Sequence, residues 1–522
     1  MLPTLAARLA TAVFDPLPAV VPHTIRPLPG SLRTQFTANL AKGTAITHLG
    51  TRHMPTTRTV LGITAALMLA ISPVAPASAG GETLRAKEIA AGYEAIFLCS
   101  DTFVGHMSEA AIDGTDLTGW RFPLDSLHAT IDRKAKRVSV EFDPGMPPRI
   151  AVWRPLLGCA HLPIGASPEV ANAVPRLPHD LAPPSLDHAD WPRGDANATA
   201  PLPAARKAAL DALVAKAFDG STYGKGSKTS SVLVLLDGRI VAEHYSLGVT
   251  MHTPQRTWSM AKSLVATLIG RAVELGRIKV SMPANIPQWQ HPGDPRAAIT
   301  IDQLLRMNSG LWTDGPGNRT DSLYWGGSTV PETAAAAPLE AAPGSRFNYA
   351  NNDFLLATYS LMNTLGPDAL AFPFKEVLWP LGMTRTTPET DWQGHYVMSS
   401  QVWMTARDSA RLALLYANDG MFDGKQLLPK DWAGYVSSTR GAQPENAKTP
   451  RYGAGFWVLD SRQGLPSGTF AMEGSRGQYA IIVPSANIIV VRRDFDPLDA
   501  RFDIDRFTHD ALGVLKGEGD RQ

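Results

Sequence analysis

Residues 257–276 read TWSMAKSLVATLIGRAVELG and place a serine and a lysine three positions apart at the start of an apolar run. Apolar residues return at the spacing of one helix face, at positions 264, 265, 268, 269, 273 and 275, and Gly276 is a typical stop signal. The pattern predicts a buried helix. Residues i and i+3 on a helix lie about 5 to 6 Å apart between Cβ atoms. The hydroxyl of Ser259 and the amine of Lys262 can therefore meet.

The functional interpretation makes Ser259 a nucleophile and Lys262 its base. A serine in the first turn of a helix also lies beside backbone N–H groups without helical partners, which can bind an oxyanion. The alternative is that Ser259 only caps the helix and that Lys262 is solvated. A chain of this length is expected to contain about one Ser-x-x-Lys pattern by chance, so the pair needs a second motif.

Composition narrows the class of protein. With 522 residues, the chain exceeds one typical domain, so a large core with an added region is expected. Basic and acidic side chains nearly balance, 49 against 48, and a formal net charge of +1 gives no reason to expect a nucleic-acid partner. No cysteine and histidine cluster has metal-ligand spacing, so neither a metal nor another cofactor is expected.

The N-terminal segments predict export. Residues 1–53 show no sustained periodicity and are expected to be disordered or outside the natural product. From Met54, an arginine precedes the apolar run LGITAALMLAIS and then PVAPASA with an A-x-A pattern. This order is typical of a signal peptide, here residues 54–79, and predicts a secreted or periplasmic protein whose mature chain begins near Gly80. A membrane anchor is the alternative, but the apolar run is too short to cross about 30 Å of hydrocarbon, so no stable span is expected in the mature chain.

The chain has two cysteines, Cys99 and Cys159, and both lie in residues 80–162. In an oxidising compartment such a pair favours a disulfide, with two unpaired buried thiols as the alternative. Closing a loop of about 60 residues contributes about 4 kcal/mol on the chain-entropy model. Residues 80–162 are therefore predicted to form a small disulfide-bonded α+β region. Nine prolines in residues 163–204 predict an extended linker that runs along the next domain.

Residues 205–516 carry the patterns of a larger α+β domain. Two β-rich runs flank Asp237-Gly238, which is a strong hairpin signal. Further strands are expected at 453–459, 469–472, 478–484 and 488–493, and helices at 203–218, 300–307, 351–365, 406–418 and 504–515. This order predicts a sheet with helices packed on it. The long loop 311–346, which carries Tyr324, is expected to contact the substrate and set specificity.

A second motif supports the first. Tyr-Ala-Asn at 349–351 follows a Pro-Gly turn and, together with Ser-Met-Ala-Lys at 259–262, resembles the serine β-lactamase and penicillin-binding protein superfamily, in its class C and esterase-like branch. The resemblance covers about 203–494. It implies a central antiparallel sheet with helices on both faces plus an all-helical subdomain, and it implies that Tyr349 and Asn351 face the serine and lysine across a cleft. Another Tyr-Ala-Asn begins at Tyr416, but there the asparagine ends a helix and has a plain capping role.

The third motif of that superfamily, Lys-Ser/Thr-Gly, is matched by position at 472–474, where only Gly474 fits. Without the lysine there is no cation to hold a β-lactam carboxylate, which argues against β-lactamase and D,D-peptidase activity. The run GSRGQ at 474–478 instead resembles 6-aminohexanoate-dimer hydrolases and related esterases. This resemblance implies an oxyanion hole made by the backbone N–H groups of Ser259 and Ser475. It also allows Arg476 to replace the missing cation, a solvated arginine being the alternative.

The expected function is that of a secreted serine hydrolase that cleaves a small ester or amide through an acyl-enzyme on Ser259. Lys262 and Tyr349 would act as general base and acid, and Asn351 would orient the lysine. No G-x-S-x-G pattern occurs, so the α/β-hydrolase arrangement is not expected. Two alternatives remain. One is a penicillin-recognising covalent sensor or D,D-peptidase-like protein without efficient turnover, and the other is a non-catalytic cell-wall interaction protein that binds through its N-terminal region.

Overall fold

The computed structural model describes residues 83–118, 124, 127–313 and 320–516, which belong to one compact unit. The predicted signal peptide and the segment before it lie outside the described residues. Within the described ranges, no helix combines the length and the apolar character that a membrane crossing requires.

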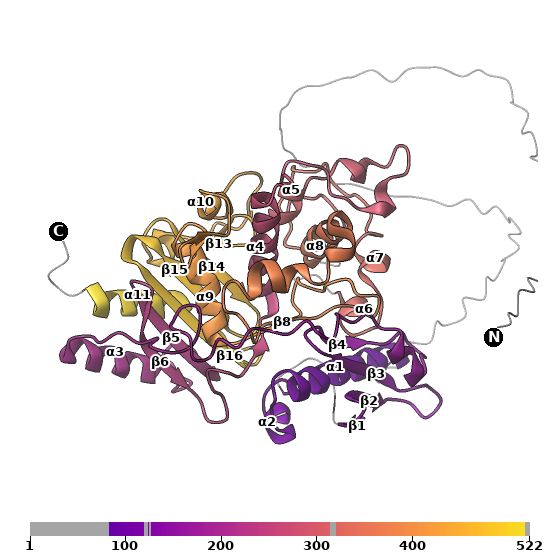
Figure 1. Cartoon of the computed structure of the whole chain (residues 1–522), viewed down its shortest axis with the longest axis horizontal. Coiled ribbons are helices and arrows are strands. Elements are labelled where there is room, and N and C mark those ends of the chain that lie inside the picture. Colours follow the sequence, from indigo (N-terminus) through magenta and orange to yellow (C-terminus); the bar gives the residue numbers. More distant parts are fainter. Residues whose placement is uncertain (1–82, 119–123, 125–126, 314–319, 517–522) are drawn as a thin grey trace, which may run out of the picture. The chain divides into compact units, whose positions relative to one another are not determined.

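A seven-stranded antiparallel sheet forms the centre of the C-terminal region, with strand order β12-β13-β14-β15-β16-β5-β6 (Figure 1). The strands are β5 (Thr229–Leu236), β6 (Arg239–Tyr245), β12 (Arg451–Tyr452), β13 (Trp457–Leu459), β14 (Thr469–Gly474), β15 (Gln478–Val483) and β16 (Ile488–Asp494). Asp237 and Gly238 join β5 to β6 with φ of 49° and 77°, the left-handed values that a tight hairpin turn requires. The predicted hairpin is therefore confirmed.

Alternation along the strands gives each face of the sheet its own core. Leu233 and Leu235 of β5 pack into the larger core, on the face covered by α4 (Ala261–Glu274) and α9 (Ala406–Ala417). Val232 and Val234 pack into a second core, against α3 (Ala204–Lys216) and α11 (Ile504–Lys516). The prediction of a sheet with helices on both faces is confirmed.

A helical part continues from the larger core, beyond α4 in Figure 1. Its helices and helical turns are η3 (Pro287–Trp289), η4 (Pro295–Ala298), α5 (Ile301–Leu305), α6 (Asp321–Tyr324), α7 (Val330–Thr333), α8 (Asn351–Leu365), η5 (Gly366–Asp368) and η6 (Pro373–Leu378). Helix α8 packs against both α4 and α5. Because α8 begins at Asn351, the second sequence motif lies at the start of a helix that faces the nucleophile helix.

Short elements complete the C-terminal region. They are β7 (Gln255–Arg256), β8 (Thr387–Pro388), β9 (Val402–Met404), β10 (Met421–Phe422), β11 (Lys425–Gln426), α10 (Trp432–Ser437), η7 (Ser461–Gln463) and η8 (Pro484–Ala486). The three-stranded sheet β7-β9-β8 matters for the site, because β7 leads into the Ser259 segment. The backbone N–H of Thr257 donates to the carbonyl of Val402 at 2.8 Å, which ties that segment to β9.

The N-terminal region is a small α+β unit. Helix α1 (Leu84–Phe103) packs on a four-stranded antiparallel sheet of β1 (His128–Asp132), β2 (Arg137–Glu141), β3 (Arg149–Arg154) and β4 (Gly158–His161), and α2 (Glu109–Asp113) follows α1. The predicted disulfide between Cys99 and Cys159 is confirmed, and it joins α1 to β4. The sheet side facing α1 is apolar, as Val138 and Val140 are fully buried.

Between the two regions, residues 163–204 have little regular structure, with one short helical turn, η1 (Pro168–Asn172). Their end lies along β6, where Thr199 forms a β-bridge with Ile240. The Trp191 indole N–H also donates to the Gly238 carbonyl at 2.8 Å. The proline spacing thus yields an extended segment on the C-terminal region.

Candidate active site

The nucleophile segment departs from the predicted single helix. Ser259 lies in a 3-10 turn, η2 (Trp258–Met260), and the α-helix α4 begins two residues after the serine, at Ala261. Trp258 has φ of 50°, a left-handed value that is an outlier for a bulky side chain. Such strain persists only where the surroundings fix it, and it is common beside functional side chains. Ser259 is therefore presented by a constrained turn.

Lys262 is buried in contact with neutral oxygen atoms. Its Nζ donates to Ser259 Oγ at 3.0 Å, to Asn351 Oδ1 at 2.7 Å and to the Ser399 carbonyl at 2.8 Å. The residue is 1% exposed, and among the described residues no carboxylate forms an ion pair with it. Burial lowers the pKa of Lys262 to about 7, because desolvation penalises its charged form. At neutral pH a large fraction of Lys262 is a neutral amine, which can accept a proton.

Ser399 is a site residue that sequence reasoning did not find. It lies in the segment before β9, and its backbone carbonyl rather than its side chain accepts from Lys262. Its hydroxyl shares a hydrogen bond with Tyr324, whose side chain is buried in the core behind the lysine. Tyr324 thus supports Ser399 from within the protein, and its expected contact with the substrate stays a prediction.

Tyr349 lies beside both members of the serine and lysine pair. The Lys262 Nζ is 5.1 Å from the centre of its ring, and Ser259 is a hydrogen-bond partner of its hydroxyl. The ring stacks on Trp457 of β13 at 5.5 Å, which fixes its orientation. Burial raises the pKa of Tyr349, with a smaller contribution from the nearby Glu473. The phenol therefore keeps its proton at neutral pH and can donate it.

The end of β14 closes the other side of the site. A Cβ on Gly474 would lie 2.3 Å from the Thr257 carbonyl and 3.1 Å from the Ser259 nitrogen, so a side chain cannot be accommodated there without movement. Glycine thus allows the strand to approach the nucleophile closely. Ser475 follows in the turn to β15 and is exposed. The two backbone segments expected to form an oxyanion hole therefore meet at Gly474.

Arg476 does not take the place of the missing cation. Its side chain is 1% exposed and forms a 3.0 Å ion pair with Asp116 of the N-terminal region. Its Nη2 donates to the Thr115 carbonyl at 2.9 Å, and its Nε donates to the Asp496 carbonyl at 2.8 Å. Both expectations for this residue, substrate binding and a solvated arginine, are wrong, because the N-terminal region and the segment after β16 satisfy the guanidinium.

A pocket of about 390 Å³ borders the site through Trp457, the residue stacked on Tyr349. Glu473, which directly precedes Gly474, and Asp505 of α11 also line it, while Arg501 and Lys448 are exposed. Burial and then repulsion from Asp505 raise the pKa of Glu473 to about 7. A group that titrates near neutral pH thus lies beside Tyr349 in addition to Lys262.

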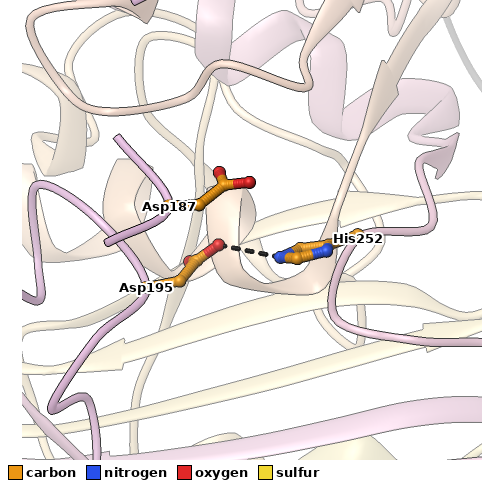
Figure 2. Close-up of side chains that lie close together, drawn as sticks. All are labelled: Asp187, Asp195 and His252. Atoms are coloured by element: carbon orange, nitrogen blue, oxygen red, sulfur yellow. Dashed lines mark hydrogen bonds and ion pairs between the residues drawn. The ribbon is translucent and has the colours of Figure 1, made fainter. Parts of the chain in front are cut away.

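Among the described residues, one cluster outside this site has the donor types of a metal centre, namely Asp187, Asp195 and His252 (Figure 2). The two carboxylates already bind arginines. Asp187 accepts two bonds from Arg385, at 2.9 and 2.7 Å, and Asp195 accepts one from Arg411 at 2.6 Å. Positive charges so close oppose a divalent cation. The cluster fits an ion-pair network that fastens the 163–204 segment to the C-terminal region.

Comparison with known proteins identifies the family of this chain. Residues 210–493, more than half of the chain, match the family described as Beta-lactamase. The chain therefore belongs to the Beta-lactamase family of serine hydrolases. It is 24% identical over 310 residues to the 6-aminohexanoate-dimer hydrolase of Paenarthrobacter ureafaciens, which covers 54% of this chain and 76% of that protein.

The chain is also similar to two solved structures. A penicillin-binding protein homologue from Caulobacter crescentus has a TM-score of 0.50 at 18% identity, over 61% of this chain and 98% of that one. A putative 6-aminohexanoate-dimer hydrolase from Bacillus anthracis has a TM-score of 0.48 at 21% identity, over 65% of this chain and 87% of that one. At 18% identity, the likeness to the Caulobacter crescentus protein supports the fold alone.

Proposed function

We propose that this protein hydrolyses a small ester or amide through an acyl-enzyme on Ser259. The observation that carries the proposal is the environment of Lys262, a buried amine with a pKa of about 7 whose Nζ lies 3.0 Å from the serine Oγ. A lysine serves as a general base only when neutral, and its pKa is best matched to the task near the working pH. The ester or amide class is supported by the likeness to the dimer hydrolase, whose name denotes cleavage of a small dimer.

In the acylation step, neutral Lys262 accepts the hydroxyl proton of Ser259 while Oγ forms a bond to the acyl carbon. The resulting oxyanion accepts hydrogen bonds from the backbone N–H groups of Ser259 and Ser475. As the tetrahedral intermediate collapses, Tyr349 donates a proton to the leaving alcohol or amine and regains one from Lys262. The bond to the leaving group breaks, and the acyl group stays on Oγ.

In the deacylation step, water attacks the acyl carbon and gives its proton to the same Tyr349 and Lys262 pair. The second tetrahedral intermediate then breaks its bond to Oγ, which takes back the proton and restores the serine. Asn351 holds the Lys262 Nζ in place through its Oδ1, and the Ser399 carbonyl provides a second fixed acceptor. Neither acceptor carries a charge, so neither would stabilise the protonated lysine as a carboxylate would.

The test is covalent labelling followed by turnover. Wild type should react with a fluorophosphonate, Ser259→Ala should not, and the control Ser461→Ala, at an exposed serine, should react like wild type. A panel of short esters, linear amides, D-amino-acid amides and a chromogenic cephalosporin then identifies the substrate class. Labelling with a burst but no turnover would replace this proposal by the covalent sensor, and no labelling of Ser259 would leave the non-catalytic alternative.

We also propose that the protein is exported, with residues 54–79 as the signal peptide. The Cys99–Cys159 disulfide supports this, since such bonds persist in oxidising compartments. Cell fractionation followed by mass spectrometry of the mature chain tests it. The expected product begins near Gly80 and is found outside the cytoplasm, whereas a cytoplasmic product that retains residues 54–79 would contradict export.

A further inference from the structure

The N-terminal region reaches the turn that carries Ser475. Arg476 has φ of 58°, and its guanidinium enters the N-terminal region rather than the site. There Nη1 donates to Asp116 Oδ1 at 3.0 Å, and Nη2 donates to the carbonyls of Thr115 at 2.9 Å and Thr118 at 3.3 Å. These three contacts, together with the 2.8 Å bond from Nε to the Asp496 carbonyl, fix the backbone one residue after the proposed oxyanion donor.

Asp116 is itself held in place. It is 3% exposed, and its backbone carbonyl accepts a hydrogen bond from the Tyr93 hydroxyl at 2.5 Å. Tyr93 belongs to α1, which the Cys99–Cys159 disulfide fastens to β4. The ion pair to Arg476 thus rests on the covalently closed part of the N-terminal region, and a buried pair of this kind is costly to break from one side.

The same helix supports the nucleophile from behind. Phe97 of α1 packs on Trp258, with 5.9 Å between ring centres, and the Arg256 guanidinium lies 4.7 Å from Phe97 and 4.2 Å from Trp258. Arg256 also donates to Ser400 Oγ at 3.0 Å, next to the residue whose carbonyl binds Lys262. Trp258 is the strained residue directly before Ser259, so α1 contacts the segment whose backbone must be held most firmly.

We infer that the N-terminal region positions both backbone donors of the oxyanion hole, with Asp116 acting through Arg476 on the Ser475 side and Phe97 acting through Trp258 on the Ser259 side. The inference rests on the proposed function, because it assigns these residues to the same site. Donors that stabilise an oxyanion must be preorganised, and a displacement of about 1 Å far from the chemistry can cost about 100-fold in rate. Asp116 and Phe97 are positioning residues, since neither touches the reacting atoms.

The experiment compares Asp116→Ala with the isosteric Asp116→Asn in the full chain. For a short p-nitrophenyl ester, Asp116→Ala should lower kcat by about 10-fold or more while KM stays within about twofold, because only stabilisation of the transition state is lost. Asp116→Asn keeps an acceptor for Arg476 and should recover part of the rate. The midpoint of the pH profile should stay near 7, because the contacts of Lys262 are unchanged.

The matched control is Thr390→Val, which removes a 2.8 Å bond from Arg154 to Thr390 between the same two regions, away from the Ser475 turn. Its kcat should equal that of wild type. A boronic acid that forms a tetrahedral adduct on the serine adds a second measurement. Asp116→Ala should weaken boronate binding by the same factor as kcat, which a general loss of stability would not do at temperatures where the variant is folded.

Equal kcat and equal boronate affinity in Asp116→Ala and Thr390→Val would overturn the inference. Should Asp116→Ala fail to fold, Phe97→Leu tests the Ser259 side with the same two measurements and the same expected losses, and unchanged values there would also overturn it. Failure of the proposed function can be distinguished from failure of this inference, because in that case wild type itself would not react with the fluorophosphonate.

Discussion

Two buried basic side chains, Lys262 and Arg476, show how the same chain uses a basic group for two purposes. Both side chains are about 1% exposed. Lys262 is surrounded by a hydroxyl, an amide oxygen and a carbonyl, whereas Arg476 meets the carboxylate of Asp116 as well as carbonyls. Desolvation without an opposite charge favours the neutral amine, while a carboxylate partner favours the charged form. A buried lysine that meets only neutral acceptors can therefore act as a base, whereas a guanidinium keeps its charge and serves here as a structural anchor.

The largest effect should come from removing the amine. Lys262→Met leaves Ser259 without a base, and kcat/KM for a short ester should fall by about 1,000-fold or more. Lys279→Met, at an exposed lysine just beyond α4, should retain wild-type kinetics. A comparison of ester hydrolysis by the two purified variants decides the point. Substantial turnover by Lys262→Met would show that another group takes the serine proton.

The next largest effect should follow from filling the space at the end of β14. A methyl group at position 474 would lie 2.3 Å from the Thr257 carbonyl, so Gly474→Ala must displace one side of the proposed oxyanion hole. Losing one such donor costs about 100-fold in kcat. Gly513→Ala is the control, because a Cβ there meets no atom within 4 Å and lies in helix α11. If Gly474→Ala keeps the wild-type kcat, the end of β14 does not contribute to the oxyanion hole.

A charged acceptor should stabilise the protonated form of Lys262, so that it stays a cation as Arg476 does. Asn351→Asp would place a carboxylate at the 2.7 Å contact with Nζ, and an opposite charge at this distance raises a pKa by about 1 to 3 units. The rise of kcat/KM with pH, expected at about 7 in wild type, should move to about 8 or higher. At pH 7 the rate should fall by about 10-fold and recover at higher pH.

Asn285→Asp, at an exposed asparagine, is the control and should keep the wild-type midpoint. The direction of this pH dependence follows from the mechanism. The active form has neutral Lys262, so activity is present above the pKa and lost as the pH falls through it. A midpoint that does not move in Asn351→Asp would mean that the profile reports a group other than this lysine.

Glu473 should have the smallest effect. Its carboxyl also has a pKa of about 7, so it titrates over the same range as Lys262. No hydrogen bond or ion pair joins it to Ser259 or Lys262 among the described residues, and its charge raises the pKa of three nearby phenols, Tyr349, Tyr452 and Tyr479. Glu473→Gln should therefore change kcat/KM by less than about twofold and leave the midpoint of the pH profile in place. If kcat/KM of this variant no longer rises through pH 7, the pH profile reports Glu473, and the pocket that Glu473 lines takes part in the reaction.

Patterns that depend on neighbours in the chain could be predicted. The i, i+3 spacing brings Ser259 and Lys262 together, and the apolar periodicity gives α8 its bounds, 351–365. The hairpin at Asp237-Gly238 follows from the backbone angles that this pair tolerates. Elements of two or three residues, such as β7 and β9, carry no period and were not predictable.

Contacts that depend on distant segments could not be predicted. Ser399 binds Lys262 through a backbone carbonyl, and a carbonyl leaves no signature in the side-chain sequence. Arg476 follows Ser475 directly, so its position along the chain suggested the site. Its left-handed backbone and a carboxylate 360 positions away direct it elsewhere. An arginine's role is set by its long-range partner, which spacing alone does not reveal.

The buried ion pair of Arg476 and Asp116 limits how this chain can be shortened. The segment recognisable by family likeness, residues 210–493, contains the arginine but not the aspartate, and Trp258 but not Phe97. A shorter chain limited to residues 210–493 would leave Arg476 without its carboxylate partner. It would also expose the aromatic surface of Trp258 beside the proposed nucleophile. The N-terminal region and residues 210–493 therefore belong to one compact unit, and removing either side of this ion pair leaves the other side without its partner.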